Sequence, residues 1–117
     1  MSEMCWICNA TKKEQLAFVH IDASTPRELA GNPAASAIIS WYLSQNRGDL
    51  ITFVGDYDEP DSLPFGLTFD EISLWPDKTD EIIDTLINEE ILTDFGKKYE
   101  DEDDPDNIYL RDLRNCW

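Results

Sequence analysis

The stretch DKTDEIIDTLINEEIL, residues 77–92, is the clearest helix in the sequence and decides the class of the fold. Its apolar residues recur at helical spacing and form one stripe, which consists of Ile82, Ile83, Leu86, Ile87 and Ile91. Polar residues three or four positions apart occupy the opposite face, namely Asp77, Glu81, Asp84 and Asn88. The pattern predicts a helix with one buried side and one charged side.

The residues before this helix predict two strands and two further helices. Leu16–Ile21 is short, apolar and partly β-branched, and Leu50–Val54 has the same character before Gly55. Residues 25–28, TPRE, match a capping box with proline at the first helical position. Residues 32–46 begin with Asn-Pro and predict a second helix.

The remaining segments complete an α+β pattern. Residues 56–66 read as a loop, because two prolines and a glycine interrupt them. Residues 68–71, TFDE, predict another capping box before a short helix. Gly96 is expected to end the helical region, and Ile108–Leu110 to form a last strand. We therefore expect a small single α+β domain, a short β-sheet packed against two or three helices.

Composition places this expected fold among globular proteins. Of the 117 residues, 42% are hydrophobic, which is too high for a disordered chain and sufficient for one domain over residues 1–117. The N-terminal region has no apolar segment of signal-peptide length, and no apolar run approaches a membrane span. Three cysteines do not suggest a disulfide framework. We expect a cytoplasmic protein with reduced thiols and no membrane contact.

The net charge of −16 is distributed very unevenly. Residues 1–48 are near neutral, with four acidic and four basic side chains, whereas residues 49–117 carry 21 acidic side chains against five basic ones. Solubility needs a net charge of only about 2–8 on a small domain. The excess indicates a strongly basic partner, and it argues against direct binding of nucleic acid or anionic membranes.

Three segments carry the candidate partner-binding carboxylates. Residues 100–106 hold six carboxylates in seven positions, residues 56–61 hold four, and the charged helix face holds three. Carboxylates four residues apart on a helix are separated by about 6 Å along its axis, which is close to the separation of neighbouring phosphates on a DNA strand. The candidate set is Asp56, Asp58, Glu59, Asp61, Asp77, Glu81, Asp84, Glu100, Asp101, Glu102, Asp103, Asp104 and Asp106.

No metal or catalytic site is predicted. Calcium loops starting at Asp56 or Asp101 lack the required glycine and place proline at a ligand position. Cys5 and Cys8 have the spacing of zinc ligands, but a complete zinc site would also need His20 and Cys116. Three interpretations of these cysteines stay open: buried thiols, a structural zinc site and a redox pair. No nucleophile motif or phosphate-binding glycine loop is present, so we expect a non-catalytic protein without a cofactor.

The size and the three acidic segments resemble the small acidic DNA-mimic proteins of bacteria and phages, of which the bacterial mimic that binds the histone-like protein HU is the most similar in size. The resemblance concerns charge pattern and length in the acidic part of the chain. It implies a monomer that occupies the DNA-binding surface of HU or a similar basic protein. The alternative is an immunity protein against a cationic nuclease toxin. Such a protein would add aromatic anchors, for which the candidates are Tyr57, Phe65, Phe69, Trp75, Tyr99 and Tyr109.

Overall fold

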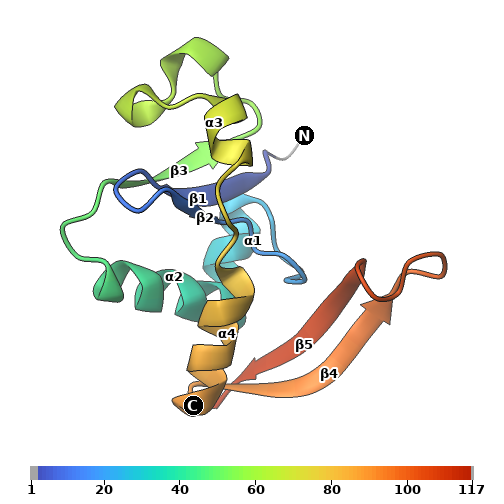
Figure 1. Cartoon of the computed structure of the whole chain (residues 1–117). Coiled ribbons are helices and arrows are strands. Elements are labelled where there is room, and N and C mark those ends of the chain that lie inside the picture. The colour runs from blue at the N-terminus through green and yellow to red at the C-terminus, as the bar shows by residue number, and fades with distance from the viewer. Residues whose placement is uncertain (1–2, 117) are drawn as a thin grey trace.

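The computed structural model describes residues 3–116 and has the expected α+β class, with two antiparallel sheets and four α-helices in that part of the chain (Figure 1). In chain order the elements are β1 (Cys5–Asn9), β2 (Glu14–Leu16), α1 (Pro26–Gly31), α2 (Pro33–Gln45), β3 (Ile51–Gly55), the 3-10 turns η1 (Pro60–Ser62) and η2 (Pro64–Gly66), α3 (Phe69–Ser73), α4 (Thr79–Asn88), β4 (Leu92–Glu100) and β5 (Tyr109–Asn115). None of the helices described has the length and apolar character needed to cross a membrane.

The first sheet, ordered β2-β1-β3, separates two hydrophobic clusters. Side chains alternate between the faces of a strand, so Cys5 and Ile7 of β1 join the larger cluster, beside α1, α2 and α4. Trp6 and Cys8 join the smaller cluster, together with Val54 and the segment that contains α3. The strand β1 therefore lies between two cores, although the sequence pattern did not predict a strand there.

The helix α4 packs its predicted stripe onto the larger cluster. Ile83 and Leu86 are fully buried, and the other three apolar residues pack against the same cluster. The helix is shorter than predicted and covers Thr79–Asn88. Glu90 has a left-handed φ of 60° and stops it, and Leu92 already belongs to β4.

The predicted strand over Leu16–Ile21 is wrong beyond its first residue. Phe18 and His20 have left-handed φ values of 57° and 66°, which an extended strand does not allow. The backbone N–H of Phe18 donates to Oγ1 of Thr79 at 3.1 Å, so this segment bonds to the start of α4 instead of pairing as a strand. Leu16, Phe18 and Ile21 are nevertheless buried, whereas Ala17 and Val19 are exposed, so only part of the apolar segment belongs to the core.

Local signals placed the other helices correctly. The capping box at Thr25 and Glu28 is complete, and α2 begins after Asn32, whose side-chain oxygen accepts the N–H of Ala35. In α3 the hydroxyl of Thr68 accepts the N–H of Glu71, which is one of the two hydrogen bonds of the predicted capping box. The sheet strand β3 also matches its predicted segment closely.

The strands β4 and β5 form a two-stranded hairpin, here called the arm (residues 92–115), which projects from the rest of the chain (Figure 1). Gly96 does not end the preceding region as predicted but lies inside β4, with φ 96°. The pairing register shifts between Asp94 and Lys97 and again before Tyr99. These irregularities, together with the glycine, bend the ribbon away from the helices.

Candidate binding surface

The acidic run forms the loop at the end of the arm and has a defined conformation. Oδ2 of Asp101 accepts hydrogen bonds from the backbone N–H groups of Asp103 and Asp104, at 3.0 and 3.1 Å. The carbonyl oxygen of Asp104 accepts the N–H groups of Asn107 and Ile108, and the N–H of Asp101 donates to the carbonyl of Ile108. The loop, here called the tip (residues 100–106), is therefore folded by its own polar groups.

The tip divides its six carboxylates into two kinds. Asp101 and Asp104 accept hydrogen bonds within the loop, and Glu100 lies 3.8 Å from Nζ of Lys97. Three carboxylates are exposed and have no ion pair or hydrogen bond within residues 3–116: those of Glu102, Asp103 and Asp106. These three present unneutralised charge at the end of a projecting ribbon.

Arg111 attaches the inner part of the arm to the body. Its Nη2 donates to Oδ2 of Asp94 at 2.8 Å, and its Nη1 lies 3.5 Å from Oδ1 of Asp80 in α4. The hydrogen bond from Arg111 holds the pKa of Asp94 below its usual range. The backbone N–H of Arg111 also donates to the carbonyl of His20, at 2.9 Å.

A second attachment surrounds the ring of Tyr109. The imidazole of His20 stacks on it with 3.6 Å between centroids, and Nδ1 of His20 donates to the Tyr109 carbonyl at 2.9 Å. Nζ of Lys97 lies 4.2 Å from the centroid of the same ring. Together with the pair of Lys98 and Asp22 at 3.3 Å, these contacts hold the outer strands while leaving the tip free.

The acidic loop after β3 is also partly occupied by internal bonds. Oδ1 of Asp56 accepts the N–H of Met4 at 3.0 Å, and Oδ2 of Asp58 accepts the N–H of Gly55 at 2.9 Å. The carboxylates of Glu59 and Asp61 are exposed. Two of the four predicted residues in this loop therefore shape the chain, and two remain available to a partner.

The predicted row of carboxylates on α4 is incomplete. Asp77 precedes the helix, and its Oδ1 accepts the N–H and the hydroxyl of Thr79, at 3.0 and 2.6 Å. Glu81 is exposed but lies 3.3 Å from Nζ of Lys78, and Asp84 is exposed on the helix. Only the last two lie within the helix, since the first precedes the N-cap Lys78 and its carboxylate is occupied by hydrogen bonds from Thr79.

The three acidic segments do not form one continuous stripe. Figure 1 shows the 56–66 segment beyond the end of β3, the tip at the far end of the arm, and α4 at a third place. The chain therefore offers separate acidic sites on a molecule with principal extents of 40 × 35 × 25 Å. The tip is the one that stands clear of the body.

The aromatic candidates divide between core and surface. Trp75 is buried in the smaller cluster, and Phe69 packs against it. Tyr57, Phe65 and Tyr99 are about half exposed, at 52%, 49% and 51%. Two exposed apolar residues that were not predicted also belong to the arm, Phe95 at 57% and Ile108 at 53%. Apolar surface therefore accompanies the acidic surface on the arm.

The cysteines do not converge on a common point. Cys5 and Cys8 point to opposite faces of the first sheet, because they are three positions apart along an extended strand, which is an odd offset. Burial is the main cause that raises the pKa of each thiol to about 11. Within residues 3–116 no three His, Cys, Asp or Glu side chains are grouped as metal ligands.

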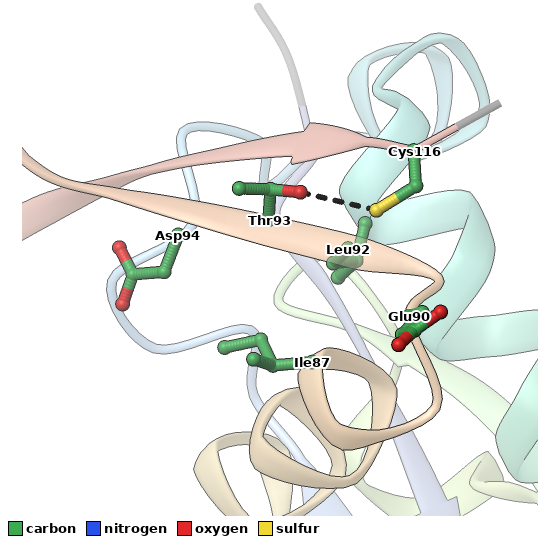
Figure 2. Close-up of a pocket in the computed structure, with 6 residues that line it drawn as sticks. All are labelled: Ile87, Glu90, Leu92, Thr93, Asp94 and Cys116. Atoms are coloured by element: carbon green, nitrogen blue, oxygen red, sulfur yellow. Dashed lines mark hydrogen bonds between the residues drawn. The ribbon is translucent and has the colours of Figure 1, made fainter.

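Cys116 lies instead at the base of the arm, beside a hollow of about 670 Å³ (Figure 2). Its sulfur is 3.1 Å from Oγ1 of Thr93, and the thiol is exposed. Asp94 and Glu90 also line this hollow and appear at opposite sides of the view in Figure 2. Within residues 3–116 the Cys116 thiol makes no hydrogen bond to a carboxylate or an imidazole.

Comparison of the chain with protein-family models, with curated proteins and with solved structures found no match.

Proposed function

We propose that this chain is a non-catalytic binding protein whose acidic arm occupies the nucleic-acid-binding surface of a basic protein. The observation that carries the proposal is the tip: three exposed carboxylates that form no ion pair with any residue of 3–116, held on a folded loop at the end of a projecting hairpin. Because the loop is ordered by its own hydrogen bonds, a partner does not have to pay the entropy of ordering it.

The charge of the whole chain supports the same proposal. A net charge of −16 accelerates the encounter with a basic surface and repels nucleic acid. The carboxylates of Glu59 and Asp61 are placed for a second contact away from the tip. In this proposal the protein competes with nucleic acid for its partner and needs neither a cofactor nor a metal ion.

Two partners fit the proposal: an HU-like nucleoid protein, for which the chain would be a DNA mimic, or a cationic nuclease toxin, for which it would be an immunity protein. The exposed side chains of Phe95, Tyr99 and Ile108 on the arm favour the second, since aromatic and apolar anchors dominate tight protein interfaces. The separation of the acidic segments points the same way, because a continuous row of anions would reproduce the regular phosphate spacing of DNA more closely.

A capture experiment tests the proposal. The immobilised full-length chain is exposed to host lysate and washed with rising salt, and bound proteins are identified by mass spectrometry. An HU-like protein released at moderate salt and displaced by DNA supports the mimic. A nuclease that remains at high salt and is inhibited by the chain supports the immunity protein.

Variants assign the binding to the tip. The triple variant Glu102→Gln, Asp103→Asn, Asp106→Asn removes three charges, and we expect at least a tenfold loss of affinity for the captured partner, about 1.4 kcal/mol. The matched control removes three exposed charges elsewhere, with Asp70→Asn, Glu71→Gln and Glu89→Gln. Equal losses of affinity in both variants would show that the tip contributes only to the net charge and is not a specific binding site. Capture of no basic protein would refute the proposal.

A further inference from the structure

The strand β3 leaves one edge of the first sheet open. The N–H of Ala10 donates to the carbonyl of Leu50, and the N–H of Asp56 donates to the carbonyl of Met4. Hydrogen-bonded pairs alternate along antiparallel strands, so the backbone groups of Ile51 and Phe53 point away from β1. The other edge of this sheet is covered, because β2 exchanges hydrogen bonds with residues 76–78.

The outward groups of β3 are largely without partners. Within the described part of the chain, the N–H groups of Ile51 and Phe53 donate no hydrogen bond. The carbonyl of Ile51 accepts none there. The carbonyl of Phe53 accepts a hydrogen bond from the hydroxyl of Thr52, at 3.1 Å, and from no other group among residues 3–116. An edge of this kind can pair with an added strand.

A groove of about 610 Å³ lies beside this open edge. Its walls include Phe53 of β3, Leu29 of α1 and Ile39 of α2, with small residues between them. Phe53 is 47% exposed although it lies on the sheet face that carries the larger cluster. The volume falls in the range of pockets that bury ligand side chains.

The end of the groove near Gly55 is acidic. Glu3 and Asp58 line it, and the side chain of Glu3 lies over Gly55, where an added Cβ would meet its Oε2. Asp56 is exposed next to them. The groove therefore changes from apolar at Phe53 to anionic two residues further along β3.

We infer that β3 and this groove bind an extended segment of a partner protein by strand addition. The segment pairs with Ile51 and Phe53, inserts an apolar side chain beside Phe53, and directs Lys or Arg toward Glu3 and Asp58. Because residues i and i+2 of a strand share one face, the apolar and the basic residue stand two positions apart. This surface is separate from the tip and gives the chain a second recognition site.

The charge of the chain selects a foreign segment over a second copy. Pairing β3 with β3 of another copy would bring two acidic rims together, each on a chain of net charge −16. Like charges placed in register oppose association. A basic segment has the complementary charge.

Selection from a random dodecapeptide library displayed on phage, with the full-length chain as bait, tests the inference. We expect enriched peptides with an apolar residue and a Lys or Arg two positions apart. Binding of a selected peptide should slow hydrogen exchange at the N–H groups of Ile51 and Phe53, while those of Thr52 and Val54 are already slow in the free chain.

Three variants complete the test. Phe53→Thr suits an exposed strand position and should weaken peptide binding at least tenfold, whereas the matched change Phe95→Thr on the arm should have no effect. The pair Glu3→Gln with Asp58→Asn retains an acceptor for the Gly55 N–H and should remove the preference for basic residues. The tip triple variant should bind the peptide normally, which separates this inference from the proposed function.

The opposite results overturn the inference. It fails if no peptide is enriched, if Phe53→Thr leaves binding unchanged, or if the exchange of Ile51 and Phe53 is unaffected. It also fails if sedimentation shows a dimer that Phe53→Thr dissociates, because the occupant would then be a second copy.

Discussion

Arg111 donates a hydrogen bond across the arm to Asp94, with 2.8 Å between Nη2 and Oδ2. The other carboxylate oxygen, Oδ1, accepts the N–H of Gly96 at 2.8 Å, at the register shift of β4. The second terminal nitrogen of Arg111 reaches Asp80 in α4. The Asp94 carboxylate and the Arg111 guanidinium thus connect the two strands of the arm with each other, with the bend of β4 and with α4. The direction in which the tip projects therefore depends on this pair.

Replacing Asp94 with asparagine should loosen the arm. We expect Asp94→Asn to lower the free energy of unfolding by about 1 kcal/mol, since it removes a charge-assisted hydrogen bond that is partly exposed. Amide exchange in β4 and β5 should accelerate more than exchange in α4. The control is Asp112→Asn, whose partner Arg114 is on the same strand. Equal acceleration in both variants would contradict this role for Asp94.

The pair of Asp94 and Arg111 should make the free energy of unfolding depend on pH in the acidic range. The pKa of Asp94 is lowered in the folded chain, mainly by the Arg111 hydrogen bond. The ionised side chain therefore stabilises the folded chain at pH values above the pKa of aspartate in the unfolded chain, about 3.9. This stabilisation is lost as the pH falls through the lower pKa of the folded chain. Urea unfolding of wild type and Asp94→Asn should therefore differ at pH 6 and converge toward pH 2. A constant difference would exclude this titration.

Asp77 should prove to be a structural residue. Its Oδ1 accepts the N–H and the hydroxyl of Thr79 and, at 3.3 Å, the N–H of Ala17. We expect Asp77→Ala to lower the free energy of unfolding by about 1–2 kcal/mol and Asp77→Asn to have a smaller effect, because asparagine keeps an acceptor. Neither should change partner affinity by more than twofold. A large loss of affinity with unchanged stability would restore Asp77 to the binding surface.

The thiols should react at very different rates. Cys5 and Cys8 are buried, and their pKa values near 11 leave almost no thiolate at pH 7.5, whereas Cys116 is exposed. A thiol reagent should therefore modify one cysteine quickly in the native chain and all three in denaturant. Substitution of Cys116 with serine should abolish the fast reaction. Zinc that protects Cys5 and Cys8 together would contradict their placement on opposite faces.

Tyr42 should stabilise the larger core through its hydroxyl group. The hydroxyl donates to Oε2 of Glu14 at 2.5 Å and accepts Nδ2 of Asn9 at 3.0 Å, in a side chain that is 4% exposed. We expect Tyr42→Phe to lower the free energy of unfolding by about 1–2 kcal/mol, because both partners lose a hydrogen bond. Tyr57→Phe, at an exposed position, serves as the control in the same denaturation measurement. Equal effects would contradict the prediction.

The sequence predicted those elements that depend on neighbouring residues. The capping box of Thr25 and Glu28, the start of α2 after Asn32 and the apolar stripe of α4 all agree with the structure. Each is set by side chains within four residues of one another or by a helical period. The exposed acids of the tip were likewise visible in the sequence, because a dense acidic run cannot be buried.

Prediction failed where a segment's partners are distant in the sequence. Leu16–Ile21 has the composition of a strand, but the N–H of Phe18 bonds to Thr79, 61 residues away. No strand was predicted around Cys5 and Cys8, but pairing with both neighbours makes this segment β1. Asp77 belonged to the helical pattern, and only the tertiary structure placed it before the helix, where its carboxylate accepts hydrogen bonds from Ala17 and Thr79.

By itself, the sequence determined the α+β class, the helix caps, the amphipathic face of α4 and the concentration of charge in residues 49–117, because these follow from composition and from interactions between near neighbours. Only the tertiary structure decided which carboxylates hold the backbone and which remain free, that residues 92–115 form an arm, and that β3 has an open edge beside an apolar groove. The physical reason is that strand pairing and contacts such as that of Arg111 with Asp80, 31 residues apart, depend on how the whole chain packs.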